Sequence, residues 1–376
     1  MRSTIALTAS TAWYLYNYRR GLIRELLNRE CQVVSYVPDG TYSHRLSQLG
    51  VKGVPISMSQ YGVDDGEMNV VAEEYRRSFL ELKVGILLTF TIKPNILASV
   101  AASALDIPVI ATVPGLGMAF LFEGEMKRRA IELYRKSFVG VRRVFFQNVN
   151  DFDSFVGWGI ISHQAGEVVG GSGVDLEYFR FLPKINDSRA HKCRFLYFGR
   201  IMRPKGIVEF GRAARIVAAQ RPHASFVVAG SHEAWGLNTI TEEEFRDCVS
   251  LNQSVEYLGH VEDVRGLIEA ADCVVLPSYY PEGAPHSLLQ SAAIGRPIIT
   301  TETPGCRRTI EPGVSGLICK AGDVGSLVRA MLKMNDMGAE ARNIMGIAGR
   351  RKIEAEFDER SVIARYVEAI DMAISK

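Results

Sequence analysis

The sequence predicts an α/β protein with two doubly wound domains, and three observations support this class. Short runs of β-branched and aromatic residues alternate with amphipathic stretches, as in parallel sheets that carry helices on both faces. The chain has 376 residues, which is more than one domain usually contains. The alternation pauses once, at residues 166–183, and then starts again.

The first half of the chain contains six predicted strands. They are STIALTAS (3–10), CQVVSYV (31–37), VKGVPIS (51–57), VGILLTF (84–90), IPVIATV (107–113) and VRRVFFQ (141–147). The stretches 19–29 and 70–83 have apolar residues at helical spacing. Ser and Thr interrupt the apolar N-terminus, so we interpret it as a first strand followed by a loop, not as a signal peptide.

The second half repeats the pattern after a glycine-rich connection. Its predicted strands are KCRFLYFG (192–199), ASFVVAG (224–230), SVEYLGH (254–260), DCVVLPS (272–278) and RPIITT (296–301). Its predicted helices are 207–220, 324–334 and 360–374. We therefore expect an N-terminal domain at 1–170, a C-terminal domain at 171–357, and a final helix at 358–376 that packs back on the first domain. A ligand cleft is expected between the domains, beyond the carboxyl ends of the strands.

Composition excludes several classes of function. The net charge of +2 gives no general attraction to nucleic acid. The six cysteines form no CxxC pair, so we expect free thiols in a reducing, cytoplasmic compartment. No GxGxxG follows the first strand, which disfavours a nicotinamide-dependent oxidoreductase. Neither GxxxxGK[ST] nor GxSxG stands in a suitable context, which argues against P-loop kinases and serine hydrolases.

Two motifs in the second half predict binding of a diphosphate. YFGRIMRPKG (197–206) places Arg200 and Lys205 around a turn after a strand, where an arginine can bind phosphate bidentately and a lysine supplies a point charge. Two solvated surface cations are the alternative interpretation.

PEGAPHSLLQSAAIGRP (281–297) also follows a strand. Pro285 suits a first helical turn, so the N–H groups of Ser287 and Leu288 would form an anion site at the helix start. Phosphate would repel Glu282, which is better placed to accept hydrogen bonds from sugar hydroxyls. Gln290 shares a helix face with residues 286 and 287 and can border the anion site; an exposed helix position is the alternative interpretation.

These motifs together resemble a known family. FGRIMRPKG, the stretch VEYLGHVEDVRGLIEAADCVVLPSYYPEGAPHSLLQ and the connecting GSGVDLEYF are similar to the retaining glycosyltransferases of family GT4, which have the GT-B fold of two Rossmann-like domains. TFTIKPNILASVAA (89–102) and ATVPGLGMAF (111–120) resemble a subgroup that adds hexoses or N-acetylhexosamines to lipid-linked glycans for surface polysaccharides such as lipopolysaccharide.

The resemblance implies roles for individual residues. Arg200 and Lys205 would stabilise the leaving diphosphate, and Glu282 would contact the donor sugar; these three are the implied catalytic residues. Backbone groups of His260 and Val261 would meet the base. The implied donor-binding residues are Gly199, Arg200, Lys205, His260, Val261, Glu282, Gly283, Ala284, Pro285, His286, Ser287, Leu288 and Gln290.

The acceptor side is implied to lie in the first domain. Lys93 and Asn95, in a loop after the strand at 84–90, would face the acceptor, as would Gly115 and Gly117 in a flexible PGLG segment. The co-substrate is expected to be a UDP-sugar, and no cofactor is expected. No essential metal is expected either, because the acidic DFD (151–153) looks like a helix cap and not like a metal-binding motif.

The chain departs from the family pattern in three places. Gln290 replaces the second acid of E-x7-E, which usually contacts the nucleotide ribose; a neutral acceptor weakens that bond by about 1 kcal/mol. STAWYL stands where many relatives have Gly-Gly, and VPGLG stands where many have a histidine. The lack of an obvious base agrees with a front-face mechanism in which the leaving phosphate takes the acceptor proton.

A basic segment predicts contact with a membrane. Residues 127–143 hold seven cations and one acid and follow the apolar MAFLF. Such a segment suits the anionic inner leaflet and a lipid-linked acceptor, although a solvated helix face is the alternative. We therefore expect a cytoplasmic protein that can act at the cytoplasmic face of the membrane.

Two other functions remain open from the sequence. A GT-B epimerase acting on UDP-N-acetylglucosamine would need several acids, and Glu282 alone fits it poorly. A weakly active nucleotide-sugar-binding protein is suggested by Gln290.

Overall fold

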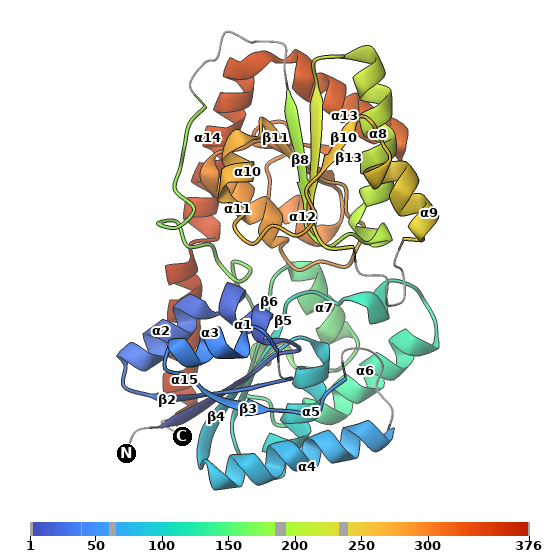
Figure 1. Ribbon diagram of the computed structural model, residues 1–376. Coiled ribbons are helices and arrows are strands. Elements are labelled where there is room, and N and C mark those ends of the chain that lie inside the picture. The colour runs from blue at the N-terminus through green and yellow to red at the C-terminus, as the bar shows by residue number, and fades with distance from the viewer. Residues whose placement is uncertain (1–2, 39, 60–64, 185–192, 233–239, 375–376) are drawn as a thin grey trace. The chain divides into compact units, whose positions relative to one another are not determined.

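The computed structural model describes residues 3–38, 40–59, 65–184, 193–232 and 240–374. The chain divides into two compact units, residues 1–173 with 359–376 and residues 174–358. Figure 1 shows a sheet with helices on both of its sides in each unit. The chain therefore passes between the units twice, after Gly173 and after Asp358.

The first unit is built on a seven-stranded parallel sheet of order β3-β2-β1-β4-β5-β6-β7. Its strands are β1 (Thr4–Thr8), β2 (Gln32–Val37), β3 (Lys52–Pro55), β4 (Val84–Phe90), β5 (Val109–Val113), β6 (Arg143–Phe146) and β7 (Gly166–Val168). Thr8 of β1 pairs with Tyr36 on one side and Thr89 on the other. The strand order reverses between β1 and β4, which makes this pair the switch point of the sheet.

Helices cover both faces of this sheet. They are α1 (Ala12–Tyr18), α2 (Arg20–Asn28), α3 (Ser43–Gln48), α4 (Asp65–Glu81), α5 (Ile92–Ser103), α6 (Glu125–Ser137), α7 (Val149–Gly157) and α15 (Glu359–Ile374), with short 3₁₀ turns η1 (Met118–Phe120) and η2 (His163–Ala165). One apolar core lies under α1, α2 and α15, and the other lies under α4, α5, α6 and α7.

The second unit repeats this architecture with six parallel strands in the order β10-β9-β8-β11-β12-β13. They are β8 (Arg194–Phe198), β9 (Ser225–Ala229), β10 (Val255–Tyr257), β11 (Cys273–Leu276), β12 (Ile298–Thr301) and β13 (Gly316–Cys319). Its helical elements are η3 (Arg203–Lys205), α8 (Ile207–Gln220), α9 (Glu242–Phe245), η4 (Arg246–Ser250), α10 (Arg265–Ala270), α11 (His286–Ile294), α12 (Pro304–Arg308), α13 (Val324–Asp336) and α14 (Gly338–Glu356). The switch point falls between β8 and β11.

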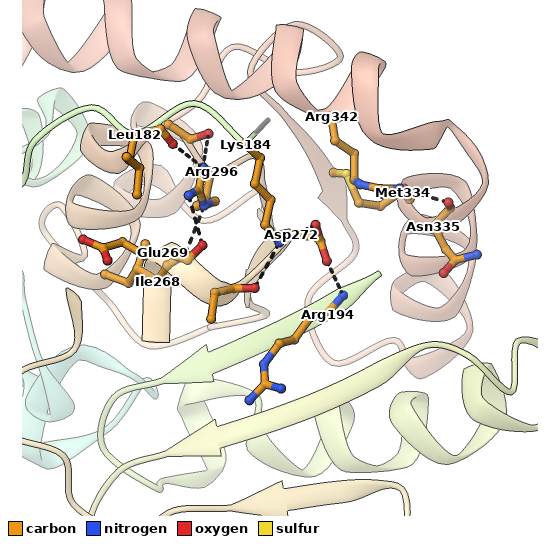
Figure 2. A network of polar contacts seen from close by, with 12 residues as sticks. Leu182, Lys184, Arg194, Ile268, Glu269, Asp272, Arg296, Met334, Asn335 and Arg342 are labelled. Carbon is orange, nitrogen blue, oxygen red and sulfur yellow. Dashed lines mark hydrogen bonds and ion pairs between the residues drawn. The ribbon is translucent and has the colours of Figure 1, made fainter. Parts of the chain in front are cut away.

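A buried arginine, Arg296, and an aspartate, Asp272, fix the amino ends of neighbouring strands, as Figure 2 shows. Arg296, just before β12, donates to the carbonyl oxygens of Leu182 at 2.8 Å, Ile268 at 3.0 Å and Glu269 at 3.1 Å. Asp272, just before β11, accepts from the backbone N–H of the first β8 residue at 2.8 Å. This network satisfies polar groups at the amino ends of the strands, whereas doubly wound sheets bind ligands at the carboxyl ends. We therefore assign it a structural role.

Helix α15 completes the first unit. Val362, Tyr366 and Ile370, at intervals of four residues, are buried in the core under α1 and α2. The Tyr366 hydroxyl lies 2.6 Å from Thr112 Oγ1 at the carboxyl end of β5. The guanidinium of buried Arg19 lies 5.4 Å from the centre of the Tyr366 ring. Residues distant in sequence therefore form one core.

The structure differs from the sequence prediction at several elements. Helix α1 replaces the predicted loop after the first strand: Thr11 caps it by accepting from the Tyr14 N–H at 3.1 Å, and Ala12 and Leu15 are buried. Helix α5 replaces the loop predicted around Lys93 and Asn95. Strands β7 and β13 were not predicted, because they have three and four residues and lie among glycines.

Candidate donor site

The candidate site lies where β8 and β11 end, at the switch point of the second unit. The segment after β8 carries Gly199, Arg200 and η3, and the segment after β11 leads through Glu282 to α11. Because the two strands are parallel neighbours, both segments leave the sheet at the same edge. This edge is where doubly wound sheets bind ligands.

One carbonyl group holds the two segments together. Pro204 O accepts from the N–H groups of Tyr279 at 2.8 Å and Tyr280 at 2.9 Å and from Ser278 Oγ at 3.2 Å. Gly206 adjoins it with a φ of +77°, and a Cβ there would lie 2.2 Å from Pro277 O. Only glycine fits this approach, which explains the Gly after Lys205 in the motif.

Lys205 and Glu282 form an ion pair at the centre of the site. Lys205 Nζ donates to Glu282 Oε1, and Ser278 Oγ donates to the same oxygen at 3.3 Å. The side chains are only 13% and 12% exposed, so the pair is largely withdrawn from solvent. The sequence motifs assigned these two residues to different parts of a donor, and the structure brings them into contact.

Arg200 lies on the solvent side of the pair. Its side chain is exposed, and its carbonyl oxygen accepts from the buried Tyr197 hydroxyl at 3.1 Å. The Tyr280 ring lies beside both cations, 5.8 Å from the Arg200 guanidinium and 5.4 Å from Lys205 Nζ. The site thus gathers two cations around one aromatic ring.

The start of α11 lies next to Glu282. Pro285 is the N-cap residue, just before the helix, and its carbonyl accepts from the N–H groups of Leu288 at 3.0 Å and Leu289 at 3.1 Å. The prediction of a Leu288 N–H available to an anion is therefore wrong, since the cap carbonyl occupies it. Ser287, half-buried in the first turn, remains a candidate for an anion contact.

Buried glycines bring the neighbouring loops close. A Cβ at Gly305 would lie 2.0 Å from Gly283 O and 2.4 Å from Glu282 O. Gly283 and Ala284 are buried between these segments. The backbone that carries Glu282 therefore packs directly against α12.

Gln290 and His286 share one face of α11, as their spacing predicts. Gln290 Nε2 lies 3.4 Å from His286 Nδ1, and both side chains are half-buried. The sequence did not predict that the histidine contacts the glutamine that replaces the family's second acid.

The predicted base-binding segment follows β10. Gly259, with a φ of +67°, turns the chain there, and its carbonyl accepts from the Gly230 N–H at 2.7 Å. His260 is exposed and Val261 is half-buried. This segment follows β10, the edge strand of the sheet, and its contact with a base stays a prediction.

The predicted acceptor-side residues of the first unit lie at the ends of β4 and β5. Lys93 and Asn95 are buried on the first turns of α5: Lys93 Nζ donates to Ser59 O and Oγ, both at 2.7 Å, and Asn95 Nδ2 donates to Thr112 O at 2.8 Å. Gly115 and Gly117 adopt φ values of +133° and +75° between β5 and η1. Packing occupies Lys93 and Asn95, and their acceptor contact stays a prediction.

Sequence reasoning missed four contributors to the site, namely Pro204, Ser278, Tyr280 and Gly305. The aromatic pair in PSYYPEG, directly after a predicted strand and before the motif acid, could have indicated Tyr280. Within the described ranges, no three His, Cys, Asp or Glu side chains gather as metal ligands do. The expectation of metal-independent activity stays a prediction.

The comparisons with known proteins agree with this geometry. A family model described as "Glycosyl transferases group 1" matches residues 192–336, the part that carries the site. The chain is a glycosyltransferase. The resemblance drawn from its motifs is confirmed.

Two curated relatives of this glycosyltransferase are similar over most of its length. One is the N,N'-diacetylbacillosaminyl-diphospho-undecaprenol alpha-1,3-N-acetylgalactosaminyltransferase of Campylobacter jejuni, 24% identical with 96% of each chain covered. The other is the UDP-Gal:alpha-D-GlcNAc-diphosphoundecaprenol alpha-1,3-galactosyltransferase of Escherichia coli, 25% identical over 78% of this chain and 77% of that protein.

Solved structures confirm the fold of the glycosyltransferase. A glycosyltransferase from Rickettsia africae aligns with a TM-score of 0.78 at 13% identity, with 99% of each chain covered. HepE of Anabaena, solved with UDP-glucose, aligns with a TM-score of 0.78 at 15% identity over 98% of this chain and 99% of that one. The predicted class of two Rossmann-like domains, the GT-B fold, is confirmed.

Proposed function

We propose that the chain is a retaining glycosyltransferase that moves a hexose or N-acetylhexosamine from a UDP-sugar to a lipid-linked glycan in surface polysaccharide synthesis. The observation that carries the proposal is the gathering of Arg200, Lys205 and Glu282 at the switch point. The names of the relatives, which include transfer to sugar diphospho-undecaprenols, support the acceptor class.

The charges of the site suit departure of a nucleoside diphosphate. As the bond between sugar C1 and the β-phosphate oxygen breaks, negative charge grows on that phosphate, and fixed cations stabilise it. Lys205 and Arg200 are those cations. Lys205 and Ser278 hold Glu282 in place. A carboxylate in this position is suited to accept hydrogen bonds from donor sugar hydroxyls.

A front-face substitution accounts for the proton without a base. The acceptor oxygen bonds to C1 on the side that the diphosphate leaves, and the acceptor proton passes to the departing phosphate oxygen. The anomeric configuration is then retained. No cofactor or metal takes part in this proposal.

A donor screen tests the proposal. The purified chain is incubated with a panel of UDP-sugars and a polyprenyl-diphosphate-linked N-acetylhexosamine, with and without EDTA, and products are identified by mass and by the anomeric coupling constant. We expect EDTA-resistant transfer with retention. Epimerised sugar nucleotide would support the epimerase alternative, and UDP-sugar binding without turnover would support the binding protein; either would overturn the proposal.

We also propose that the first unit meets the anionic inner leaflet through α6. Exposed Met126 lies in the first turn of the helix, and exposed Phe122 and Val139 flank it. The cations of the helix include exposed Arg128. Glu132 pairs with Lys136, so part of the charge is neutralised within the helix. In the described ranges, no helix has the length and apolarity needed to cross a bilayer.

Vesicle binding tests this surface. We expect salt-sensitive co-sedimentation with vesicles rich in phosphatidylglycerol and none with neutral vesicles, because the attraction is electrostatic. The variant Phe122→Ser with Arg128→Glu is expected to lose binding, whereas Leu80→Ser with Arg76→Glu on α4 is the matched control. Equal binding of both variants would contradict the proposal.

A further inference from the structure

The switch point of the first unit carries a strained residue. Thr91, directly after β4, has φ 71° and ψ 158°, a conformation that glycine alone normally adopts. Its Oγ1 lies 2.6 Å from Ser10 Oγ and accepts from the Ser10 N–H at 3.1 Å. Ser10 follows β1, so two half-buried hydroxyls meet where the strand order reverses.

An exposed indole stands one turn further along the chain. Trp13 lies on the first turn of α1, and 38% of it is exposed. Its buried neighbours Ala12 and Leu15 belong to the opposite side of the helix.

A series of ring contacts fixes this indole. The Trp13 and Tyr18 rings meet edge to face with centroids 5.1 Å apart, and Tyr18 meets Tyr14 in the same way, also at 5.1 Å. The Tyr14 hydroxyl accepts from buried Arg19 at 3.1 Å, and that guanidinium lies 4.5 Å from the centre of the Phe90 ring. Trp13 is thus an exposed ring supported by the core, not a mobile surface side chain.

We propose that Trp13 with Ser10 and Thr91 forms a subsite for a pyranose ring of the acceptor glycan. The inference rests on the proposed function, which supplies the sugar acceptor. A pyranose has an apolar face of C–H groups and a rim of hydroxyls, so it suits an aromatic surface and paired hydroxyl groups carried by the segments that follow β1 and β4. Both features lie at the carboxyl edge of the sheet, where doubly wound domains bind ligands.

Steady-state kinetics with the lipid-diphosphate acceptor test the subsite. Trp13→Ala is expected to raise the acceptor KM at least tenfold while the donor KM and the UDP Kd stay within twofold of wild type, and Trp13→Phe is expected to restore most of the loss. Tyr178→Ala is the control, because Tyr178 is 37% exposed but belongs to the second unit. An acceptor KM within twofold of wild type for Trp13→Ala would overturn the inference.

The Thr91→Gly variant separates binding from folding. Glycine accepts the backbone conformation without strain, so we expect the thermal midpoint to be preserved while the acceptor KM rises at least threefold. An unchanged KM would remove Thr91 from the subsite.

A binding measurement keeps the inference testable if no donor gives transfer. Titration with methyl N-acetyl-glucosaminide and methyl N-acetyl-galactosaminide is followed through the indole N–H resonance of Trp13 in the full chain. A saturable shift, lost in Thr91→Gly, would support the subsite even if the proposed transfer fails. No shift with either glycoside and no transfer would overturn both.

Discussion

At the scale of single residues, the candidate donor site is built around one ion pair between two neighbouring side chains. Lys205 and Glu282 neutralise each other, and Pro204 and Ser278 hold the segments that carry them. Phosphate binding would give Lys205 a second anion without removing the first. The pair is therefore expected to behave as one unit.

A double-mutant cycle measures this coupling. Lys205→Met is expected to lower kcat about 100-fold or more, since it removes a cation from the leaving phosphate. Glu282→Gln leaves Lys205 without its carboxylate and should also lower kcat. The fold decrease in kcat of the double variant should be much smaller than the product of the fold decreases of the two single variants. Strictly multiplicative losses would contradict a shared role.

Gln290→Glu tests the ribose contact. A charged acceptor should strengthen a hydrogen bond to the ribose by about 1 kcal/mol, so the donor KM and UDP Kd should fall about fivefold. The gain should shrink with 2′-deoxy-UDP if the 2′-hydroxyl is the partner. An unchanged Kd for UDP would argue against a ribose role for position 290.

Asp151 gives the first unit a pH-dependent stability. Burial raises the pKa of this carboxyl to about 7, although the 2.9 Å hydrogen bond from Asn148 opposes the shift. Because the folded pKa exceeds the unfolded one, the fold disfavours the carboxylate, and stability falls as pH rises from about 4 to about 7.

Asp151→Asn removes this ionisation but keeps an oxygen for Asn148. We expect the free energy of unfolding of the variant, relative to wild type, to increase between pH 5 and pH 8 in urea titrations. A difference that does not change with pH would contradict the raised pKa.

At the scale of elements, α15 is held by a buried hydroxyl pair between Tyr366 and Thr112. Tyr366→Phe or Thr112→Val alone leaves one buried hydroxyl without its partner and should cost about 1–3 kcal/mol of unfolding free energy. The double variant removes both hydroxyls and should be closer to wild type than their sum. Additive losses in denaturant titrations would show that the pair is not the relevant contact.

Sequence patterns predicted some elements better than others. Buried parallel strands such as β4 and β11 are near-continuous apolar runs, and α8 has its full predicted range, 207–220. Helix α1 was predicted as a loop, because AWYLYNY has only two buried positions, Ala12 and Leu15, to mark a helix face. Helix α5 was missed because IKPN begins with a β-branched residue and contains Pro94. A proline is nevertheless compatible with the first turn of a helix, where Pro94 lies.

The composition of the candidate site was predictable from the sequence, but its contacts were not. Cations and an acid after strands predicted that Arg200, Lys205 and Glu282 gather at one edge of the sheet, because parallel strands end at one edge; their contact with a donor stays a prediction. The ion pair, the Pro204 carbonyl and the occupied Leu288 N–H depend on loop conformation, which side-chain patterns do not specify.

At the scale of the whole molecule, the residues proposed to bind the donor, from Gly199 to Gln290, all belong to the second unit. UDP binding should therefore protect the backbone amides of the segments after β8 and β11 from hydrogen exchange and leave those of β1 and β4 unchanged. At 100 times its Kd, UDP should stabilise the binding-competent state by about 2.7 kcal/mol. Equal protection in both units, measured by mass spectrometry on the full chain, would contradict this assignment.

The return of α15 to the first unit also affects biosynthesis. Residues 174–358 form a continuous segment, whereas the first unit needs residues 359–374 to cover one face of its sheet. On the ribosome, the unit that is translated first is thus the last to be completed, and until then the apolar residues around Phe90 and Phe145 lack the cover of Tyr366. Nascent chains of this protein should expose that face to chaperones until residues 359–374 have emerged from the ribosome.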